Sequence, residues 1–563
     1  MRKPIAISTL FISALSLLSA CGSHHKIEPT NSSTSITLPT TDKITADQFN
    51  EARFRNDIKV LASDEFEGRA PATIGEKKTL AYLTAEFKKM GLTGANKGSY
   101  LQAVPMISYT TDEASAHVTL GELPLTYRKD VVINSRKNTT KIDINKAPLV
   151  FVGYGINAPE YQWNDYQGVD MKGKIAVILV NDPGFARPDL GKFNGKTMTY
   201  YGRWDYKYAE ASRQGAIGAL IIHQTEPASY PWSVVENSWT GAQQDLAAED
   251  QANHKKIDVE GWITLDIAKQ LFKKSALDFS SLANQAAIKP TFAKLKQTAN
   301  IKFTNQISYA DSYNVVATLE GTSAKDEHIA FIAHWDHIGK DETKTGDQIY
   351  NGALDNASGT AGIMEIARLF AQKAINGQPL KRSITFIAAT GEEQGLLGSR
   401  YYAEHPLYPL DKTVAVFNLD STNIYGKTKD YKIVGKGKSQ LENYLIQAAL
   451  TQNRVAMPEA HPEAGGFFRS DHFSFAKFGV PAVFAGGGSQ PVDAETANYK
   501  KHMQQIRKGC YHSVCDEYRS DWNVEGALQD LAVYAQAAEK LANDGAWPGY
   551  YHGTEFYYLR PAK

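Results

Sequence analysis

Five groups of polar residues in the second half of the 563-residue chain follow short apolar runs, so their side chains could converge on one place. Imidazole nitrogens and carboxylate oxygens are ligands that suit zinc. Each group alone is more often a surface pair, a helix cap or a solvated face. Their joint occurrence in order predicts a metal-binding region, and the groups are His334-Trp335-Asp336-His337, Asp355-Asn356, Gly391-Glu392-Glu393, Asn418-Leu419-Asp420 and His512.

Strand-like and helical patterns alternate from residue 312 onward. Strands are expected at 329–333, 384–389, 414–417 and 480–485, and helices at 358–372, 441–452 and 524–541. Such alternation predicts an α/β fold, a three-layer sandwich with a mostly parallel central sheet. Sheets of this kind bind ligands in the loops after the carboxyl ends of their strands, which is where the polar groups lie.

The composition limits the partners of the chain. Lys plus Arg and Asp plus Glu number 61 each, so the formal net charge is zero and no basic footprint of a nucleic-acid binder is present. We therefore expect no nucleic-acid partner. The sequence does not indicate an oligomeric state.

The first residues predict an export signal and a lipid anchor. The positively charged residues Arg2 and Lys3 are followed by the apolar stretch 5–18, which is too short for a membrane span. Leu18-Ser19-Ala20-Cys21 resembles a bacterial lipobox, so we expect 1–20 to be cleaved and Cys21 to carry acyl chains. Residues 21–45 are expected to be a flexible tether. Gly22 after the cysteine favours the outer membrane of a Gram-negative bacterium; the alternative is an ordinary secretory signal.

Two cysteines remain, Cys510 and Cys515. An exported protein meets an oxidising compartment, so a local disulfide is one reading of the pair. A catalytic thiol is the other.

The order His-x-Asp, Asp-Asn, Glu-Glu, Asp, His resembles the M28 family of zinc peptidases, over essentially residues 46–545. Secreted bacterial aminopeptidases of this family share an Arg-Ser-Asp-His stretch, here 469–472, and a Cys-Tyr-His-Ser-x-x-Cys-Asp stretch, here 510–516. The segment 61–78 also looks typical of M28 lipoproteins.

The resemblance implies two zinc ions. Asp355 would bridge them, with a cis peptide bond to Asn356. His334 and Asp420 would complete one site, and Glu393 and His512 would complete the other. The implied activity is removal of N-terminal residues from peptide substrates.

The resemblance also implies roles around these ligands. Glu392 would be the general base, and the carboxylate of Asp336 would accept a hydrogen bond from the far nitrogen of His334. Tyr511 would donate to the oxyanion, with simple packing as the alternative. Arg469 would contact the substrate or form a structural ion pair.

Similar bacterial enzymes pair the two cysteines, so the resemblance implies a disulfide between Cys510 and Cys515. His337 is expected to be a structural neighbour, and His472 to orient the pocket without binding metal.

The stretch 145–290 differs from the residues before it because it contains short apolar runs typical of buried strands. Gly-Lys-Ile-Ala-Val, a helix at 206–214, and Gly-Ala-Leu-Ile-Ile follow one another, which resembles a protease-associated (PA) domain. We therefore expect an inserted β-rich PA-like domain at 145–290, with 46–144 and 291–563 forming the catalytic domain. An elaborated lobe of the catalytic domain is the alternative.

Other functions remain open at this stage. A carboxypeptidase or another amidohydrolase would keep the same fold. A glutaminyl cyclase of this fold uses one zinc, so five ligands argue against it. A non-catalytic peptide-binding or receptor protein would be expected to lack ligands or the base, and none is missing.

Overall fold

The computed structural model describes residues 43–247 and 256–560. The expected signal segment, Cys21 and most of the expected tether lie outside these ranges. Ile44, at the end of the expected tether, is buried against α14 (Glu525–Asp544), where its amide donates to the side chain of Gln536. Within the described ranges, no helix is long and apolar enough to cross a membrane.

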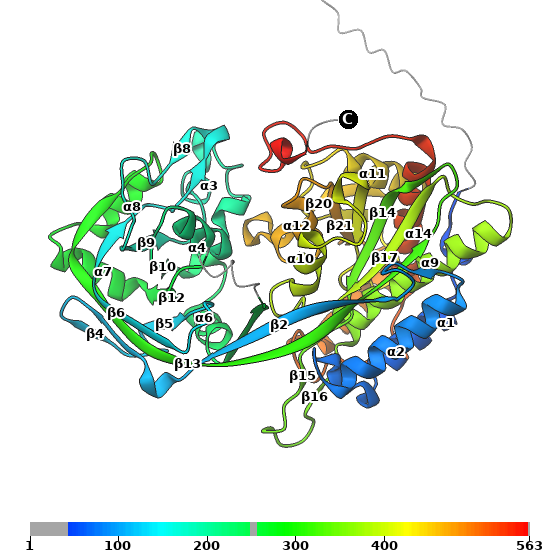
Figure 1. The fold of residues 1–563 in the computed structure, drawn as a ribbon. Coiled ribbons are helices and arrows are strands. Elements are labelled where there is room, and N and C mark those ends of the chain that lie inside the picture. The colour runs from blue at the N-terminus through cyan, green and yellow to red at the C-terminus, as the bar shows by residue number, and fades with distance from the viewer. Residues whose placement is uncertain (1–42, 248–255, 561–563) are drawn as a thin grey trace, which may run out of the picture. The chain divides into compact units, whose positions relative to one another are not determined.

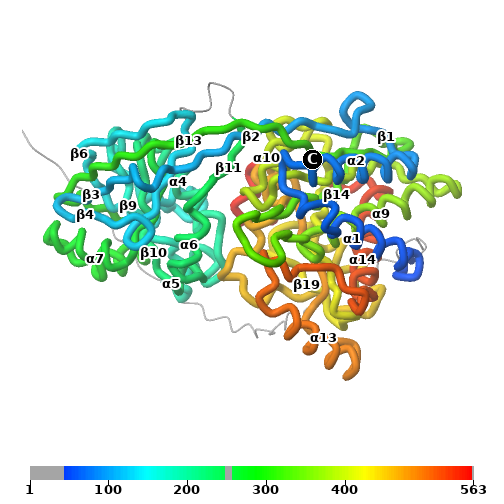
Figure 2. Tube along the Cα trace, turned by 90° about the horizontal axis from the view of Figure 1, so that it is seen from below, coloured from blue at the N-terminus to red at the C-terminus, as the bar shows by residue number. Residues whose placement is uncertain are grey.

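Apolar residues at helical spacing form α1 (Glu51–Leu61) and α2 (Ile74–Lys89). Asn50 begins α1 by accepting the N–H of Arg53 with its side chain. The apolar face of α1 is buried, and Figure 2 shows both helices beside α9 (Ser358–Ile375), which they contact.

The central sheet is mixed and mostly parallel. β14 is parallel to β17 on one side and to β18 on the other, β18 is parallel to β21, and β13 runs antiparallel to β17. The five strands are β13 (Ala293–Leu319), β17 (Arg382–Ala389), β14 (Ala324–His334), β18 (Thr413–Asn418) and β21 (Ala482–Gly487). Beyond β21 the sheet continues through β19 (Asp430–Ile433) and β20 (Val455–Pro458).

Helices cover both faces of this sheet, which gives three layers. Phe331 of β14 belongs to the core cluster shared with α1, α2, α9 and α14, whereas its neighbour Ile332 packs on the opposite face. That opposite face is covered by α10 (Leu397–Glu404) and α12 (His472–Ala476). The period-2 alternation of a strand thus places successive side chains in two separate cores.

A second sheet has its own cores and is parallel from β12 to β6. Its order is β5 (Val131–Asn134), β12 (Val259–Thr264), β10 (Gly218–His223), β9 (Ile175–Leu179), β6 (Lys141–Phe151), β13, β3 (His117–Leu120) and β4 (Leu123–Leu125). The helices that pack against it include α4 (Trp204–Arg213), α6 (Trp232–Trp239), α7 (Leu265–Lys274) and α8 (Phe279–Ala286).

Strand β13 belongs to both sheets, and Figure 1 shows it as one long green arrow. Its first part pairs with β6 and β3, and its later part pairs with β2 (Leu101–Thr111) and then with β17. The second sheet therefore takes in strands that lie before residue 145, and it ends inside β13, after residue 290. β2 also pairs with β11 (Ala242–Leu246), β15 (Gly339–Lys340) pairs with β16 (Ile349–Tyr350), and α11 (Leu441–Thr451) packs against α14.

Candidate metal centre

Parallel strands of the central sheet deliver the polar groups to one edge. β14 ends at His334, the loop after β17 carries Glu392 and Glu393, and the loop after β18 carries Asp420. Because β17, β14 and β18 are adjacent and parallel, these loops are neighbours. The arrangement follows from the strand order and needs no unusual local structure.

Asp355 lies between two histidines. Its Oδ1 is 3.4 Å from Nε2 of His334, and its Oδ2 is 3.3 Å from Nε2 of His512. It precedes α9, and its peptide bond to Asn356 is cis. One carboxylate thus faces two imidazoles with separate oxygens, which is what a ligand bridging two cations requires.

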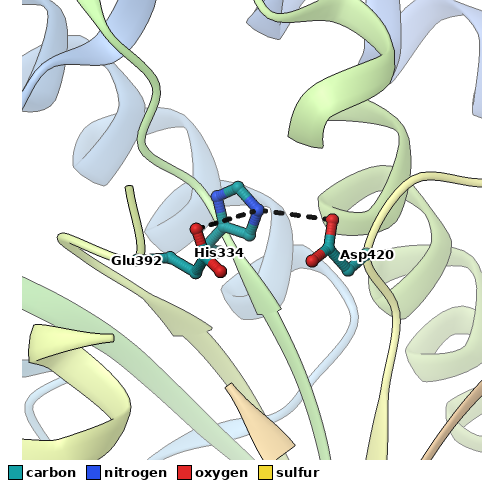
Figure 3. A group of neighbouring side chains, drawn as sticks. All are labelled: His334, Glu392 and Asp420. Atoms are coloured by element: carbon teal, nitrogen blue, oxygen red, sulfur yellow. Dashed lines mark ion pairs between the residues drawn. The ribbon is translucent and has the colours of Figure 1, made fainter. Parts of the chain in front are cut away.

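His334 is also faced by two other carboxylates, shown in Figure 3. Its Nε2 is 3.6 Å from Oδ1 of Asp420 and 4.0 Å from Oε2 of Glu392. The ligand atoms of these three residues all lie within 4.8 Å of one another, and the same holds for His334, Asp355 and Glu393. The site therefore offers two overlapping groups of nitrogen and oxygen donors.

Glu393 is held by two histidines. Its Oε2 is 2.9 Å from Nε2 of His512, and its Oε1 is 2.6 Å from Nδ1 of His337. His337 is buried and so fixes the direction of the Glu393 carboxylate. His512 has a φ of 52°, in the left-handed region that a histidine adopts at a cost, as residues at functional sites often do.

The carboxylate of Asp336 does not accept the hydrogen bond from His334 that the sequence predicted. Nδ1 of His334 is 3.2 Å from the backbone carbonyl of Asp336 but 3.8 Å from its carboxylate. The carboxylate accepts the N–H of Glu392 at 3.1 Å instead. The main-chain oxygen of Asp336 therefore orients His334 so that Nε2 faces the other carboxylates, while its side chain holds the backbone of Glu392.

The charges of the site favour a cation. Burial alone would lower the pKa of His334, but the neighbouring carboxylates, first that of Glu392, raise it well above its ordinary value. Burial also opposes a charged His512, yet hydrogen bonds to Asp355 and Glu393 raise its pKa to about 10. Burial raises the pKa of Glu392 well above the usual range of a carboxyl group. Positive charge is thus strongly attracted to this edge of the sheet.

Residues 314–536 match the peptidase family M28 model, and this stretch contains every residue named so far in the candidate centre. These residues form an M28 peptidase domain. The chain is 28% identical over 353 residues to aminopeptidase YwaD of Bacillus subtilis (strain 168), covering 62% of this chain and 60% of that protein. It is 24% identical over 248 residues to aminopeptidase Y of Saccharomyces cerevisiae, covering 41% of each chain.

The match spans less than two thirds of the length of either relative. Among solved structures, the aminopeptidase from Aneurinibacillus sp. strain AM-1 is similar with a TM-score of 0.49 and 20% identity, covering 92% of this chain and 98% of that one.

The Arg-Ser-Asp-His stretch of the M28 domain borders the candidate centre. Ser470 donates to Oδ2 of Asp420 at 2.7 Å, so the backbone of Arg469 lies next to a candidate ligand. Arg469 is exposed and forms no ion pair with any described carboxylate. His472 is buried, burial lowers its pKa to about 3, and it forms no ion pair with the described acidic residues.

The Cys-Tyr-His stretch forms a closed loop. Cys510 and Cys515 are joined by a disulfide, with His512 between them. Tyr511 is 75% exposed, and its ring stacks on that of His512 with 3.8 Å between the ring centroids. The tyrosine therefore covers a candidate ligand from the solvent side.

Sequence reasoning assigned no role to Asp516, although this residue closes the Cys-Tyr-His motif. Its carboxylate accepts the N–H groups of Leu354 and Asp355 at 3.1 and 3.0 Å, and it pairs with Arg507 at 2.7 Å. The loop that carries His512 therefore also fixes the backbone of Asp355. Its place in the motif was the only sequence signal for this role.

The donor set of the M28 domain fits divalent cations. No described lysine or arginine forms an ion pair with the four central carboxylates, and the only described partners of this kind are histidines. Buried carboxylates are stable when they are paired or bind metals. Nitrogen and oxygen donors in this mixture suit zinc, and the four carboxylates are Asp355, Glu392, Glu393 and Asp420.

Proposed function

We propose that the chain is a zinc aminopeptidase that uses two metal ions to remove N-terminal residues from peptides. The observation that carries this proposal is Asp355, whose two oxygens face His334 and His512 at 3.4 and 3.3 Å. The M28 match and the two relatives named aminopeptidases support peptides as substrates.

One ion would be held by His334, Asp420 and one oxygen of Asp355. The other would be held by Glu393, His512 and the second oxygen of Asp355. Bound ions of this kind lower the pKa of a water molecule and polarise the scissile carbonyl.

Glu392 is the proposed general base. Its backbone is held by Asp336, while its carboxylate has no hydrogen bond to a described residue and lies 4.0 Å from Nε2 of His334. It takes the proton of the attacking water and delivers it to the leaving amine. The hydroxyl of Tyr511, on the exposed ring that covers His512, is the proposed donor to the developing oxyanion.

Arg469 favours a second candidate. Arg469 is exposed, directly precedes Ser470, which contacts Asp420, and has no acidic partner among the described residues, so its guanidinium is suited to hold a substrate carboxylate. If that carboxylate is the C-terminus next to the scissile bond, the enzyme is a carboxypeptidase of the same fold.

Peptides with blocked ends separate these candidates. The purified chain is incubated with a free peptide, its N-acetylated form and its C-terminal amide, each with and without a chelator. An aminopeptidase releases the first residue from the free peptide and the amide, and loses this activity with the chelator. Release of the last residue from the N-acetylated peptide would establish the carboxypeptidase. Metal binding without hydrolysis of any of the three would indicate a non-catalytic peptide-binding protein.

We also propose that the unit built on the second sheet is a PA-like domain. The strand-helix-strand order of β9, α4 and β10 supports this proposal.

We propose further that Cys21 carries a lipid anchor in the outer membrane. The Leu-Ser-Ala-Cys stretch supports this proposal. Mass spectrometry of the N-terminal peptide tests the anchor. A lipid mass on Cys21 is expected, and Cys21→Ser should release the protein from the membrane fraction.

A further inference from the structure

Arg69 lies in the turn-rich stretch between α1 and α2, to which the proposed function assigns no role. Its side chain is fully buried and forms no ion pair with a described residue. The guanidinium donates four hydrogen bonds, all to backbone carbonyls. The acceptors, with their distances, are Leu61 at 2.6 Å, Trp335 at 2.8 Å, Asn351 at 2.6 Å and Gly352 at 2.8 Å.

These carbonyls belong to the loops that present the candidate ligands. Trp335 directly follows His334. Asn351 and Gly352 begin the turn that leads to Asp355. One guanidinium thus fastens the loop of one ligand and the turn of another to the end of α1.

The backbone around Arg69 approaches the same loops closely. The carbonyl of Arg69 accepts the N–H of His337. A Cβ on Gly68 would lie 2.4 Å from the carbonyl oxygen of Tyr350, and one on Gly352 would lie 2.5 Å from Cγ of His337. Since both glycines also have positive φ, neither position accepts a larger residue without a shift of the loops.

Arginine is the side chain that fits this position. A guanidinium carries five N–H donors in a fixed fork, whereas lysine carries three donors, so lysine would leave at least one of the four carbonyls unsatisfied. An unsatisfied buried carbonyl costs about 1–3 kcal/mol. Burial lowers the pKa of Arg69 to about 10, opposed by nearby carboxylates, first that of Asp336, so the group keeps its charge at neutral pH.

We propose that Arg69 is a positioning residue that sets the spacing between His334 and Asp355 and thereby the affinity of the site for the cation that these two residues share. The inference rests on the proposed function, because it assumes that a metal ion binds there.

Cobalt titration of the full chain tests the proposal, because the visible spectrum of Co²⁺ reports its ligand geometry. The metal-free protein is titrated with Co²⁺ in the presence of a competing chelator. Arg69→Met removes the four hydrogen bonds at similar length, and Arg69→Lys restores part of them. Arg382→Met is the control, because Arg382 is also buried and donates to the carbonyls of Leu541 and Ala546, away from the site, although unlike Arg69 it also pairs with Glu327.

Arg69→Met is expected to bind Co²⁺ about tenfold more weakly and with an altered spectrum, with partial recovery in Arg69→Lys. Arg382→Met should lose thermal stability but keep the wild-type affinity and spectrum. A folded Arg69→Met with wild-type cobalt binding would overturn the proposal. If Arg69→Met does not fold, the cobalt affinity and spectrum of Arg69→Lys are compared with those of the wild-type chain instead, and unchanged values would overturn the proposal. If neither variant folds while Arg382→Met does, Arg69 is required for folding and the proposal is also overturned.

The two proposals fail separately. A wild-type chain that binds no Co²⁺ and hydrolyses no peptide would overturn the proposed function. A wild-type chain that does both, with unchanged cobalt binding in Arg69→Met, would overturn only the role of Arg69.

Discussion

Glu392 and Glu393 are adjacent carboxylates in different surroundings. Both oxygens of Glu393 are held, one by His512 and the other by His337. The carboxylate of Glu392 is hydrogen bonded to no described residue, although its backbone is anchored by Asp336. A carboxylate with both oxygens held suits a metal ligand, and a carboxylate without a hydrogen-bond partner has an oxygen available to accept a proton from water.

Substitution of the two glutamates should therefore have different effects. Glu392→Gln is expected to keep its metal and to lower kcat at least about 100-fold, because it removes the group that carries the proton. Glu393→Gln is expected to lose one metal ion, because it removes a charged ligand. Metal analysis after dialysis and the hydrolysis rate of an aminoacyl-p-nitroanilide measure both effects. Full activity in Glu392→Gln would rule it out as the base.

Arg469 should affect substrate binding more than chemistry. Arg469→Ala is expected to raise KM for a dipeptide about tenfold while leaving kcat nearly unchanged, because a charge-assisted hydrogen bond to the substrate carboxylate is lost. The KM for the same dipeptide as an amide should change little. Arg519→Ala is the control, since Arg519 is exposed and pairs with Asp521. Equal effects on the dipeptide and its amide would contradict contact with the carboxylate.

Four of the candidate ligands could be predicted because each belongs to a local pattern that ends a strand or opens a helix, whereas His512, in the loop between Cys510 and Cys515, could be predicted only from its motif. Arg69 and Asp516 could not be assigned roles in this way. Their partners are backbone groups far along the chain, at Trp335 and Asp355 for example, and a backbone group leaves no mark in the sequence. The prediction for the Asp336 carboxylate was wrong for the same reason. This carboxylate accepts a hydrogen bond from the backbone N–H of Glu392, and a backbone partner cannot be recognised from the sequence.

Among the elements, β14 carries a titratable group at each end of its apolar run. His334 closes the strand at the candidate centre. His328 begins the run, where its ring stacks on Tyr408 and its Nδ1 is 3.0 Å from the hydroxyl of Thr385. Burial lowers the pKa of His328 to about 4, so the folded chain keeps this ring neutral.

His328 should make the protein less stable in acid. The unfolded chain takes up a proton on this residue below about pH 6.5, while the folded chain does so only below about pH 4. The free energy of unfolding should therefore decrease as the pH drops through this window, and His328 should account for a decrease on the order of 3 kcal/mol. His328→Asn should show a smaller loss between pH 7 and 4.5 in urea unfolding than the wild-type chain. The exposed His117→Asn serves as control, and an unchanged pH dependence in His328→Asn would contradict the assignment.

The loop closed by the disulfide is the second element with a separable effect. It carries His512 and leads into Asp516, which holds the amide of Asp355. Replacement of Cys510 and Cys515 by serine is expected to weaken binding of one metal ion about tenfold, because the loop gains freedom on opening. Metal content after dialysis measures this, with Ser513→Ala in the same loop as control. Wild-type metal content in the double variant would show that the loop is held without the disulfide.

At the scale of the whole molecule, β13 joins two sheets that have separate cores. The sequence indicated an insertion between 145 and 290 because the apolar runs there stand out. The strands β3, β4 and β5 are each only three or four residues long, and β13 runs from one sheet into the other as one continuous strand. The fold class could therefore be predicted from periodicity, whereas the boundaries depend on strand pairing between distant segments.

Removal of residues 112–304 should leave a folded M28 domain. Thr111 and Asn305 are paired across β2 and β13, so a two-residue Asn-Gly turn can join them as a hairpin. The buried cluster between the central sheet and α9 contains no residue from 93 to 314, so its packing does not depend on the second sheet. The deletion also removes contacts with the rest of the chain: β11 no longer pairs with β2, Arg400 loses Asp245, and Phe468 and Phe473 lose the ring of Tyr200.

The shortened chain is therefore expected to unfold cooperatively at a lower temperature and to bind metal as the full chain does. Removal of 145–290 instead would take away β12, β10, β9 and the end of β6, so β5 would lose its partner strand and the cores of the second sheet would be broken open; this second chain is expected to aggregate. Circular dichroism melts and metal analysis distinguish the two. If the 112–304 deletion aggregates as readily as the 145–290 deletion, the M28 domain depends on the second sheet for its stability and the two sheets form one folding unit.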